Sequence, residues 1–306
     1  MVTRRDFLAA SVAAPVAAPF AANLRAEPTQ AAGMVLAMHQ NTSRAAGFRG
    51  SLEGWARAGI RYVELNDAML DGFLEGDTLA AARSLLGDLG LTPVSAAAVM
   101  QDLWVPGPAH GEALETWRRR CEQFAALGLE LIYSPSTTSR RLSAEDFAGT
   151  PACIREAGEI AREHGLTAMI EFTRTSTHLA TLPTSLSMIR AASHPNVRPM
   201  LDFFHFFSGL SKTEDLELLE PGELAHAHFQ DLLEGPRELI TNDSRLIPGD
   251  GIAPVVPTLR ALAERGYSGA LSVELFRAEY VNGDPYAVAS EIRRKCEALM
   301  DAAGVA

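Results

Sequence analysis

Short apolar runs alternate with helical patterns along the chain from residue 34 to residue 275. This alternation is typical of α/β proteins whose strands pair in parallel. Several predicted helices end in a glycine just before the next apolar run, which suits the left-handed residue that terminates a helix. The runs predict eight strands: 34–39, 62–65, 92–97, 131–134, 167–171, 197–202, 224–229 and 270–275.

Eight strands favour one closed (β/α)8 barrel, the TIM barrel architecture. A doubly wound open sheet is the alternative, but no glycine-rich phosphate loop follows the first predicted strand. We expect residues 31–306 to form a single catalytic barrel, close in size to the ~250 residues typical of this architecture. Its predicted helices include 78–89, 112–126, 144–164 and 254–264.

The first 30 residues have the composition of an export signal, which is cleaved from the mature protein. Arg4 and Arg5 precede Phe7 and Leu8, and an alanine-rich stretch follows. The paired arginines predict the twin-arginine export machinery as a partner and a periplasmic or secreted location. The alternative is a tail in which two arginines are adjacent by chance. No later apolar run reaches the ~18–20 residues needed to cross a bilayer, so we expect no membrane anchor.

Net charge argues against a nucleic-acid-binding protein, and cysteine spacing argues against a disulfide-rich or zinc-knuckle protein. The formal net charge of −11 argues against a nucleic-acid partner, because phosphate binding needs a basic surface. The cysteines lie in predicted helices without the spacing of a disulfide framework or a zinc knuckle. We therefore expect buried thiols at Cys121, Cys153 and Cys296.

Four residues with metal-ligating side chains stand at the C-terminal ends of predicted strands: Glu171, Asp202, His228 and Glu274. The C-terminal ends of barrel strands converge on the catalytic face, so we expect these side chains to meet there. Two Glu, one Asp and one His form an oxygen-rich set. Such a set suits one divalent ion, either Mn²⁺, Co²⁺, Mg²⁺ or Zn²⁺.

A divalent ion with open positions would bind the carbonyl and the neighbouring hydroxyl of an α-hydroxy ketone. It would stabilise the enediolate formed when the C–H beside the carbonyl loses its proton. Carboxylates near the ion can remove that proton and return one elsewhere. We assign this catalytic role to Glu171 and Glu274, and the sequence leaves open which of them is the base.

Other polar residues fall near the same face. His205, three residues after Asp202, and Arg245, in the long connection after the seventh strand, are predicted to bind substrate. Glu64, in the second strand, is a further substrate-binding candidate. Trp104 is another, since it could stack on a sugar ring, although an aromatic residue at this place often only walls the barrel.

The remaining histidines and Asp231 are assigned by their positions in the predicted strands and loops. His39 lies at the catalytic face, whereas His226 is expected in the core one layer below His228. Asp231 either orients a metal ligand or Arg245, or is an ordinary loop acid. Surface roles are expected for the other histidines, which are His110, His164, His178 and His194.

Four segments carry a resemblance to a known family. They are LDFFHFF from Leu201, HFQD with an arginine 17 residues after its histidine, RLIPGDG from Arg245, and GYSGALSVELFRAEY up to Tyr280. On these residues the chain resembles the xylose-isomerase-like barrel superfamily, and within it the 2-keto-myo-inositol (inosose) isomerases. The resemblance implies a TIM barrel, the same four metal ligands, and substrate contacts through His205 and Arg245.

The resemblance also narrows the expected activity. Ketose 3-epimerases carry a further Glu six residues after the strand-five ligand, where this chain has Thr177, so a free-ketose 3-epimerase is disfavoured. We expect a divalent-metal-dependent isomerase or epimerase of a keto-sugar or keto-inositol, which transfers a proton through a metal-bound enediolate. The alternatives are a lyase or dehydratase acting on a keto-glycoside or inosose, and a non-catalytic sugar-binding barrel. Related barrels often dimerise, which implies a homo-oligomer.

Overall fold

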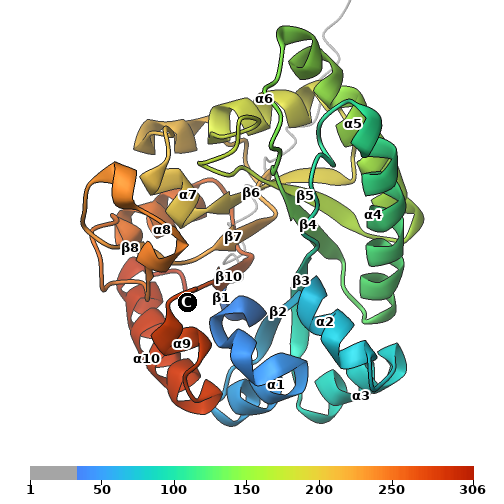
Figure 1. Cartoon of the computed structure of the whole chain (residues 1–306). Helices are drawn as coiled ribbons and strands as arrows, with labels where there is room; N and C mark the ends of the chain where they lie inside the picture. The colour runs from blue at the N-terminus through green and yellow to red at the C-terminus, as the bar shows by residue number, and fades with distance from the viewer. Residues whose placement is uncertain (1–32) are drawn as a thin grey trace, which may run out of the picture. The chain divides into compact units, whose positions relative to one another are not determined.

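Eight parallel strands close into a barrel in the computed structural model, which describes residues 33–306. Around the barrel the order is β1-β10-β7-β6-β5-β4-β3-β2, and β1 pairs with both β10 and β2. Figure 1 shows the strands at the centre and helices around them. The predicted TIM barrel is therefore confirmed. The strands are β1 (Val35–His39), β2 (Tyr62–Asn66), β3 (Thr92–Ala97), β4 (Leu131–Pro135), β5 (Thr167–Glu171), β6 (Val197–Asp202), β7 (His226–His228) and β10 (Ala270–Val273).

Helices connect successive strands and cover the outside of the barrel. Five glycines at the predicted helix-to-strand turns have φ between 63° and 89°, as their helix-ending role requires. They are Gly59, Gly90, Gly128, Gly165 and Gly266. Shorter 3-10 helices occupy Gln40–Ala46 and Thr213–Leu218. The α-helices are α1 (Gly47–Arg57), α2 (Asp67–Leu74), α3 (Leu79–Asp88), α4 (Pro108–Ala126), α5 (Ala144–Glu163), α6 (Leu182–Ala192), α7 (Phe203–Ser208), α8 (Val255–Glu264), α9 (Ala278–Val281) and α10 (Pro285–Ala303).

The barrel interior is filled by a small apolar cluster, separate from the larger core between strands and helices. Because side chains alternate across a strand, Met169 points to the same side as Glu171, and Met200 to the same side as Asp202. The cluster therefore lies directly beneath the polar residues at the strand ends. Its members are Ala97, Tyr133, Met169, Met200 and Ala225.

The connection after β7, residues 230–251, leaves the barrel and returns to it. We call it the β8–β9 excursion, because Asp231–Leu232 (β8) pairs antiparallel with Arg245–Leu246 (β9). Two 3-10 turns, Arg237–Leu239 and Asn242–Ser244, lie between them. The buried Asp231 carboxylate accepts hydrogen bonds from three backbone N–H groups, those of Leu232 (2.8 Å), Gly249 (2.9 Å) and Ala253 (2.8 Å). Asp231 thus organises the excursion, and among residues 33–306 its carboxylate makes no hydrogen bond to a predicted metal ligand.

The surface role expected for His178 is wrong. His178 is 1% exposed, its Nε2 lies 2.8 Å from Thr150 Oγ1, and its ring packs against Phe147. Burial lowers the pKa of His178 to about 4. The segment after β5 folds back against α5, which the spacing of residues along the chain does not reveal.

Three further expectations concern the cysteines, the export signal and membrane-spanning segments. The cysteines are free and buried, as predicted. The predicted export signal, residues 1–30, lies outside the described residues. Within residues 33–306, no helix is long and apolar enough to span a membrane.

Replacing Asp231 with alanine should destabilise the protein by about 1–3 kcal/mol, because the backbone N–H groups lose a buried acceptor. Urea unfolding followed by circular dichroism measures the change. Asp243→Ala is the matched control, since Asp243 is an exposed aspartate of the same excursion. Equal stability of the two variants would contradict the role given to Asp231.

Candidate metal centre and active site

Four buried side chains meet at the C-terminal end of the barrel, as their positions at strand ends predict. Glu171, Asp202 and His228 are the last residues of β5, β6 and β7, and Glu274 directly follows β10. These strands are neighbours in the barrel. One potential ligand atom from each residue lies within 4.8 Å of the others. Their role as metal ligands stays a prediction, but the required convergence is present.

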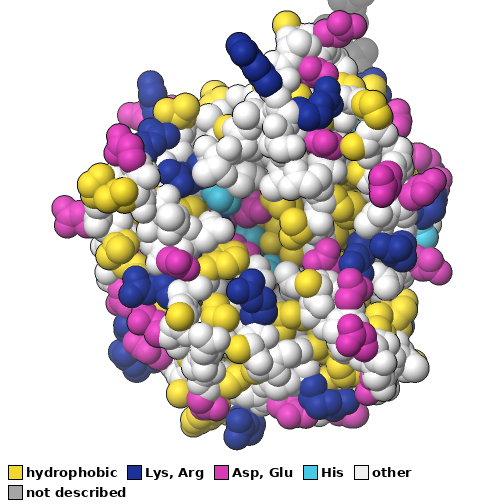
Figure 2. Space-filling model, in the orientation of Figure 1, with side chains coloured by type: hydrophobic (Ala, Val, Ile, Leu, Met, Phe, Trp, Pro, Cys, Tyr) yellow, Lys and Arg dark blue, Asp and Glu magenta, His cyan; other side chains and the backbone are white. Residues whose placement is uncertain are grey.

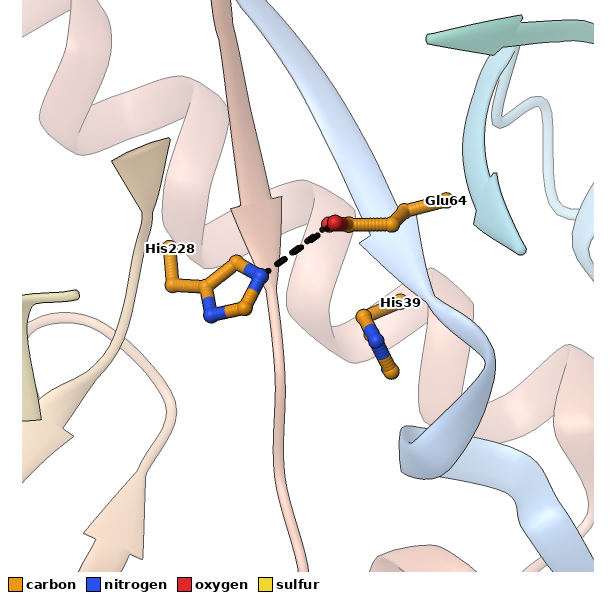
Figure 3. A group of neighbouring side chains, drawn as sticks. All are labelled: His39, Glu64 and His228. Carbon is orange, nitrogen blue, oxygen red and sulfur yellow. Dashed lines mark hydrogen bonds and ion pairs between the residues drawn. The ribbon is translucent and has the colours of Figure 1, made fainter. Parts of the chain in front are cut away.

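His228 lies at the centre of this group. Its Nδ1 is 3.1 Å from Glu171 Oε1, 3.1 Å from Asp202 Oδ2 and 3.5 Å from Glu274 Oε2. On the other side of the ring, Nε2 faces the Glu64 carboxylate at 3.3 Å (Figure 3). Burial tends to raise the pKa of Glu64, but the neighbouring His226 and His228 hold this pKa well below its usual value. An ionised carboxylate only accepts hydrogen bonds, so Nε2 of His228 carries a proton.

With its Nε2–H directed at Glu64, His228 turns Nδ1 toward the carboxylates of Glu171, Asp202 and Glu274. Such a set of donors repels itself unless a positive charge lies among them. Burial lowers the pKa of His228, but Glu64 and Glu274 outweigh this effect and hold that pKa well above its usual value. Burial also raises the pKa of Glu171 to about 7. The carboxylates therefore favour a positive charge at Nδ1 of His228, and a divalent metal ion, which binds oxygen and imidazole donors, would fit the same position.

Arg245, at the start of β9, supplies part of the positive charge. Its Nη1 lies 2.6 Å from Asp202 Oδ2 and 2.9 Å from Glu274 Oε2. The guanidinium is held between the rings of Phe204 and Phe276, with its carbon 4.5 and 5.1 Å from their centroids. Burial would raise the pKa of Asp202, yet Arg245 holds it well below its usual value.

A cavity of about 510 Å³ opens above these residues. Both predicted catalytic carboxylates, Glu171 and Glu274, line it, and so do His205 and Arg245. Figure 2 shows acidic and histidine side chains at the bottom of a central hollow. The structure thus places four of the predicted site residues around one space large enough for a small polyhydroxylated molecule.

Two predicted substrate-binding residues do not reach this cavity. Glu64 is fully buried beneath His228 and is bonded to His226 as well, with 3.0 Å between Oε2 and Nε2. Trp104 is 1% exposed, donates its Nε1–H to Ser134 O, and packs against Trp117. Glu64 contacts His228 and Trp104 packs in the barrel wall, so the substrate-binding role expected for both stays a prediction without support from the cavity lining.

The cavity-lining residues that sequence reasoning missed include Asn41, Tyr133 and Arg174. Asn41 Nδ2 donates to Glu274 Oε1 at 2.9 Å, and it follows β1 by two residues. Tyr133, from the inner face of β4, contacts His39 Nε2 through its hydroxyl at 3.1 Å. Arg174 follows Glu171 by three residues, the same spacing that separates His205 from Asp202. This three-residue spacing after a strand-end ligand was the signal in the sequence that could have identified Arg174.

Glu64→Gln should weaken divalent-metal binding by about 10–100-fold, because the neutral amide no longer fixes the His228 ring and its tautomer. Isothermal titration of the metal-stripped protein with Zn²⁺ or Mn²⁺ measures the affinity, and thermal unfolding checks the fold. Glu112→Gln, at an exposed glutamate of α4, is the control. Unchanged affinity in Glu64→Gln would contradict this support of His228.

Residues 52–298 match the sequence family described as xylose isomerase-like TIM barrel. An inosose isomerase of Halalkalibacterium halodurans is 27% identical over 233 residues, which cover 75% of this chain and 83% of that protein. The inosose isomerase of Bacillus subtilis is 27% identical over 174 residues, 56% of this chain and 63% of that protein.

Solved structures share the fold. The structure described as the IOLI protein with a binding zinc atom has a TM-score of 0.81 and 21% identity. The match covers 88% of this chain and 99% of that one. An L-ribulose 3-epimerase has a TM-score of 0.72 and 17% identity, with coverage of 88% and 95%.

Proposed function

Because the chain belongs to the xylose isomerase-like TIM barrel family, we propose that it is a divalent-metal-dependent isomerase or epimerase of a keto-sugar or keto-inositol. The curated relatives are inosose isomerases, so the general activity is that of an isomerase or epimerase. One observation carries the finer proposal. Two carboxylates, Glu171 and Glu274, line one cavity and both face Nδ1 of His228.

A divalent ion held by the four converging residues would act as a Lewis acid that polarises the substrate carbonyl. Glu171 and Glu274 come from different strands and face the same space. One of them removes the proton beside the carbonyl, and the other returns a proton to the resulting enediolate. Asn41 fixes the orientation of Glu274 by donating to its Oε1.

Arg245 is suited to bind a substrate oxygen. Its guanidinium lines the cavity, and its buried Nε has no hydrogen-bond partner among the described residues. A buried N–H without a partner is costly, and a substrate oxygen would satisfy it. His205 lies beside it, with Nε2 3.3 Å from Arg245 Nη2. These two side chains would hold the substrate while the carboxylates move protons.

Glu274→Gln should slow hydrogen exchange at the carbon beside the substrate carbonyl by about 100-fold or more, because an amide cannot accept the proton. Proton NMR in D₂O, with inososes, ketoses and 3-keto-glucosides as substrates, measures the exchange. Metal content is measured in parallel, so that loss of the ion is not mistaken for loss of the base.

Glu279→Gln, at an exposed glutamate that pairs with Arg277, is the control variant. Products of the wild-type reaction separate isomerisation or epimerisation from elimination by a lyase or dehydratase. Full exchange activity in Glu274→Gln would refute the proposed mechanism. Absence of exchange with every substrate would favour the non-catalytic sugar-binding barrel.

We also propose that residues 1–30 direct export through the twin-arginine machinery, on the basis of Arg4 and Arg5 in the sequence. Replacing both with lysine keeps the charge and removes the motif, so the full-length protein should remain in the cytoplasmic fraction. Fractionation of a bacterium that has this pathway measures the distribution, with Arg25→Lys as the control. Equal periplasmic amounts of wild type and double variant would refute the proposal.

A further inference from the structure

Arg174 places a positive charge in the cavity wall without a negative partner. Its Nε, Nη1 and Nη2 donate to the backbone carbonyls of Ser208 (3.3 Å), Ile240 (3.0 Å) and Arg237 (3.2 Å). All three acceptors are neutral. Among residues 33–306, no carboxylate forms an ion pair with this guanidinium. Arg245, by contrast, pairs with two carboxylates.

A second cation lies near the first. The side chain of Arg237, in the β8–β9 excursion, is exposed and makes no ion pair within the described part of the chain. Partial burial and the neighbouring charge of Arg237 lower the pKa of Arg174. Arg174 also contacts the backbone carbonyl of Arg237 through Nη2, so the two positively charged residues are neighbours, and an anion bound to Arg174 would reduce the repulsion between their charges.

Arg174 also has donors to spare. A guanidinium carries five N–H groups in a planar fork, and the three carbonyls use three of them. The hydroxyl-bearing side chains of Thr173 and Thr175, next to Arg174 in the sequence, line the same cavity. Glu171 and Glu274 line the same space. The cavity lining thus combines the carboxylates of the candidate metal site with an arginine that has no acidic partner among residues 33–306.

We propose that the substrate of this site is a polyhydroxy ketone that carries an anionic group, a carboxylate or a phosphate, which binds to Arg174. The ketone end then lies against Glu171 and Glu274. This inference rests on the proposed function, because it assigns a substrate class to the same site. A planar guanidinium binds carboxylate and phosphate through paired charge-assisted hydrogen bonds, which a neutral sugar hydroxyl cannot match.

The simpler interpretation is that Arg174 only braces the β8–β9 excursion against α7. Arg198 offers a matched comparison. This half-buried arginine of β6 also donates only to backbone carbonyls, those of Glu223, Gly222 and Leu224. It does not line the cavity. Loss of either arginine removes a brace, but only the loss of Arg174 should alter the choice of ligand.

The test compares three probes that differ only at C6: D-fructose, D-fructose 6-phosphate and D-fructuronate. Isothermal titration of the metal-loaded protein should show at least tenfold tighter binding of one anionic probe than of D-fructose. Arg174→Gln should remove this preference, Arg174→Lys should retain part of it, and Arg198→Gln should leave it intact. The anionic probe that binds more tightly identifies the group as phosphate or carboxylate.

Equal affinity for all three probes, or a preference that survives in Arg174→Gln, would overturn the inference. Hydrogen exchange in D₂O is followed on the same samples, so the two proposals fail separately. Exchange of D-fructose without any anion preference refutes the anionic substrate and keeps the isomerase. An Arg174-dependent preference without exchange of any probe supports the anion site and counts against the isomerase.

Discussion

The burial of four carboxylates around His228 is the constraint on which the rest of this site depends. Glu64, Glu171, Asp202 and Glu274 are buried within the reach of one imidazole ring. Burying carboxylates is costly unless cations and hydrogen-bond donors surround them. Arg245 meets part of this requirement, and His228 and His226 meet another part. The proposed divalent ion would add positive charge among the four converging residues, whose oxygen and imidazole donors suit such an ion.

The β8–β9 excursion contributes several residues to the cavity lining, namely Ile240, Thr241, Asn242 and Arg245. Asp231 organises it, Arg245 returns from it to the candidate metal site, and its carbonyls at residues 237 and 240 hold Arg174 in the wall. A single surface segment therefore determines both the electrostatics of the candidate metal site and the placement of the unpaired charge. TIM barrels commonly place such functional variation in the connections that follow the strands.

The sequence was sufficient for the barrel and for the convergence of the four strand-end residues, because strand ends and side-chain alternation follow from local patterns. The sequence did not predict how deeply each of these side chains is buried. Glu64 has the position in its strand that suggests a catalytic side chain, but β2 shifts its register against β3 between Val63 and Glu64, and the carboxylate lies beneath His228. The burial of Trp104 and His178 was not predictable for a related reason: their environment is formed by other segments of the chain, Trp117 for one and Thr150 for the other. Arg174 was missed because its significance lies in which partners it lacks.

The attachment of the excursion to Arg174 and Arg245 also links ligand occupancy to local stability. A ligand that binds these guanidinium groups binds only the conformation in which residues 237–246 are docked on the barrel. By mass action, ligand then raises the free energy needed to open this segment, while elements on the far side of the barrel gain only through global stability. Amide protection along the excursion would thus report the saturation of the cavity that Ile240, Thr241 and Asn242 help to line.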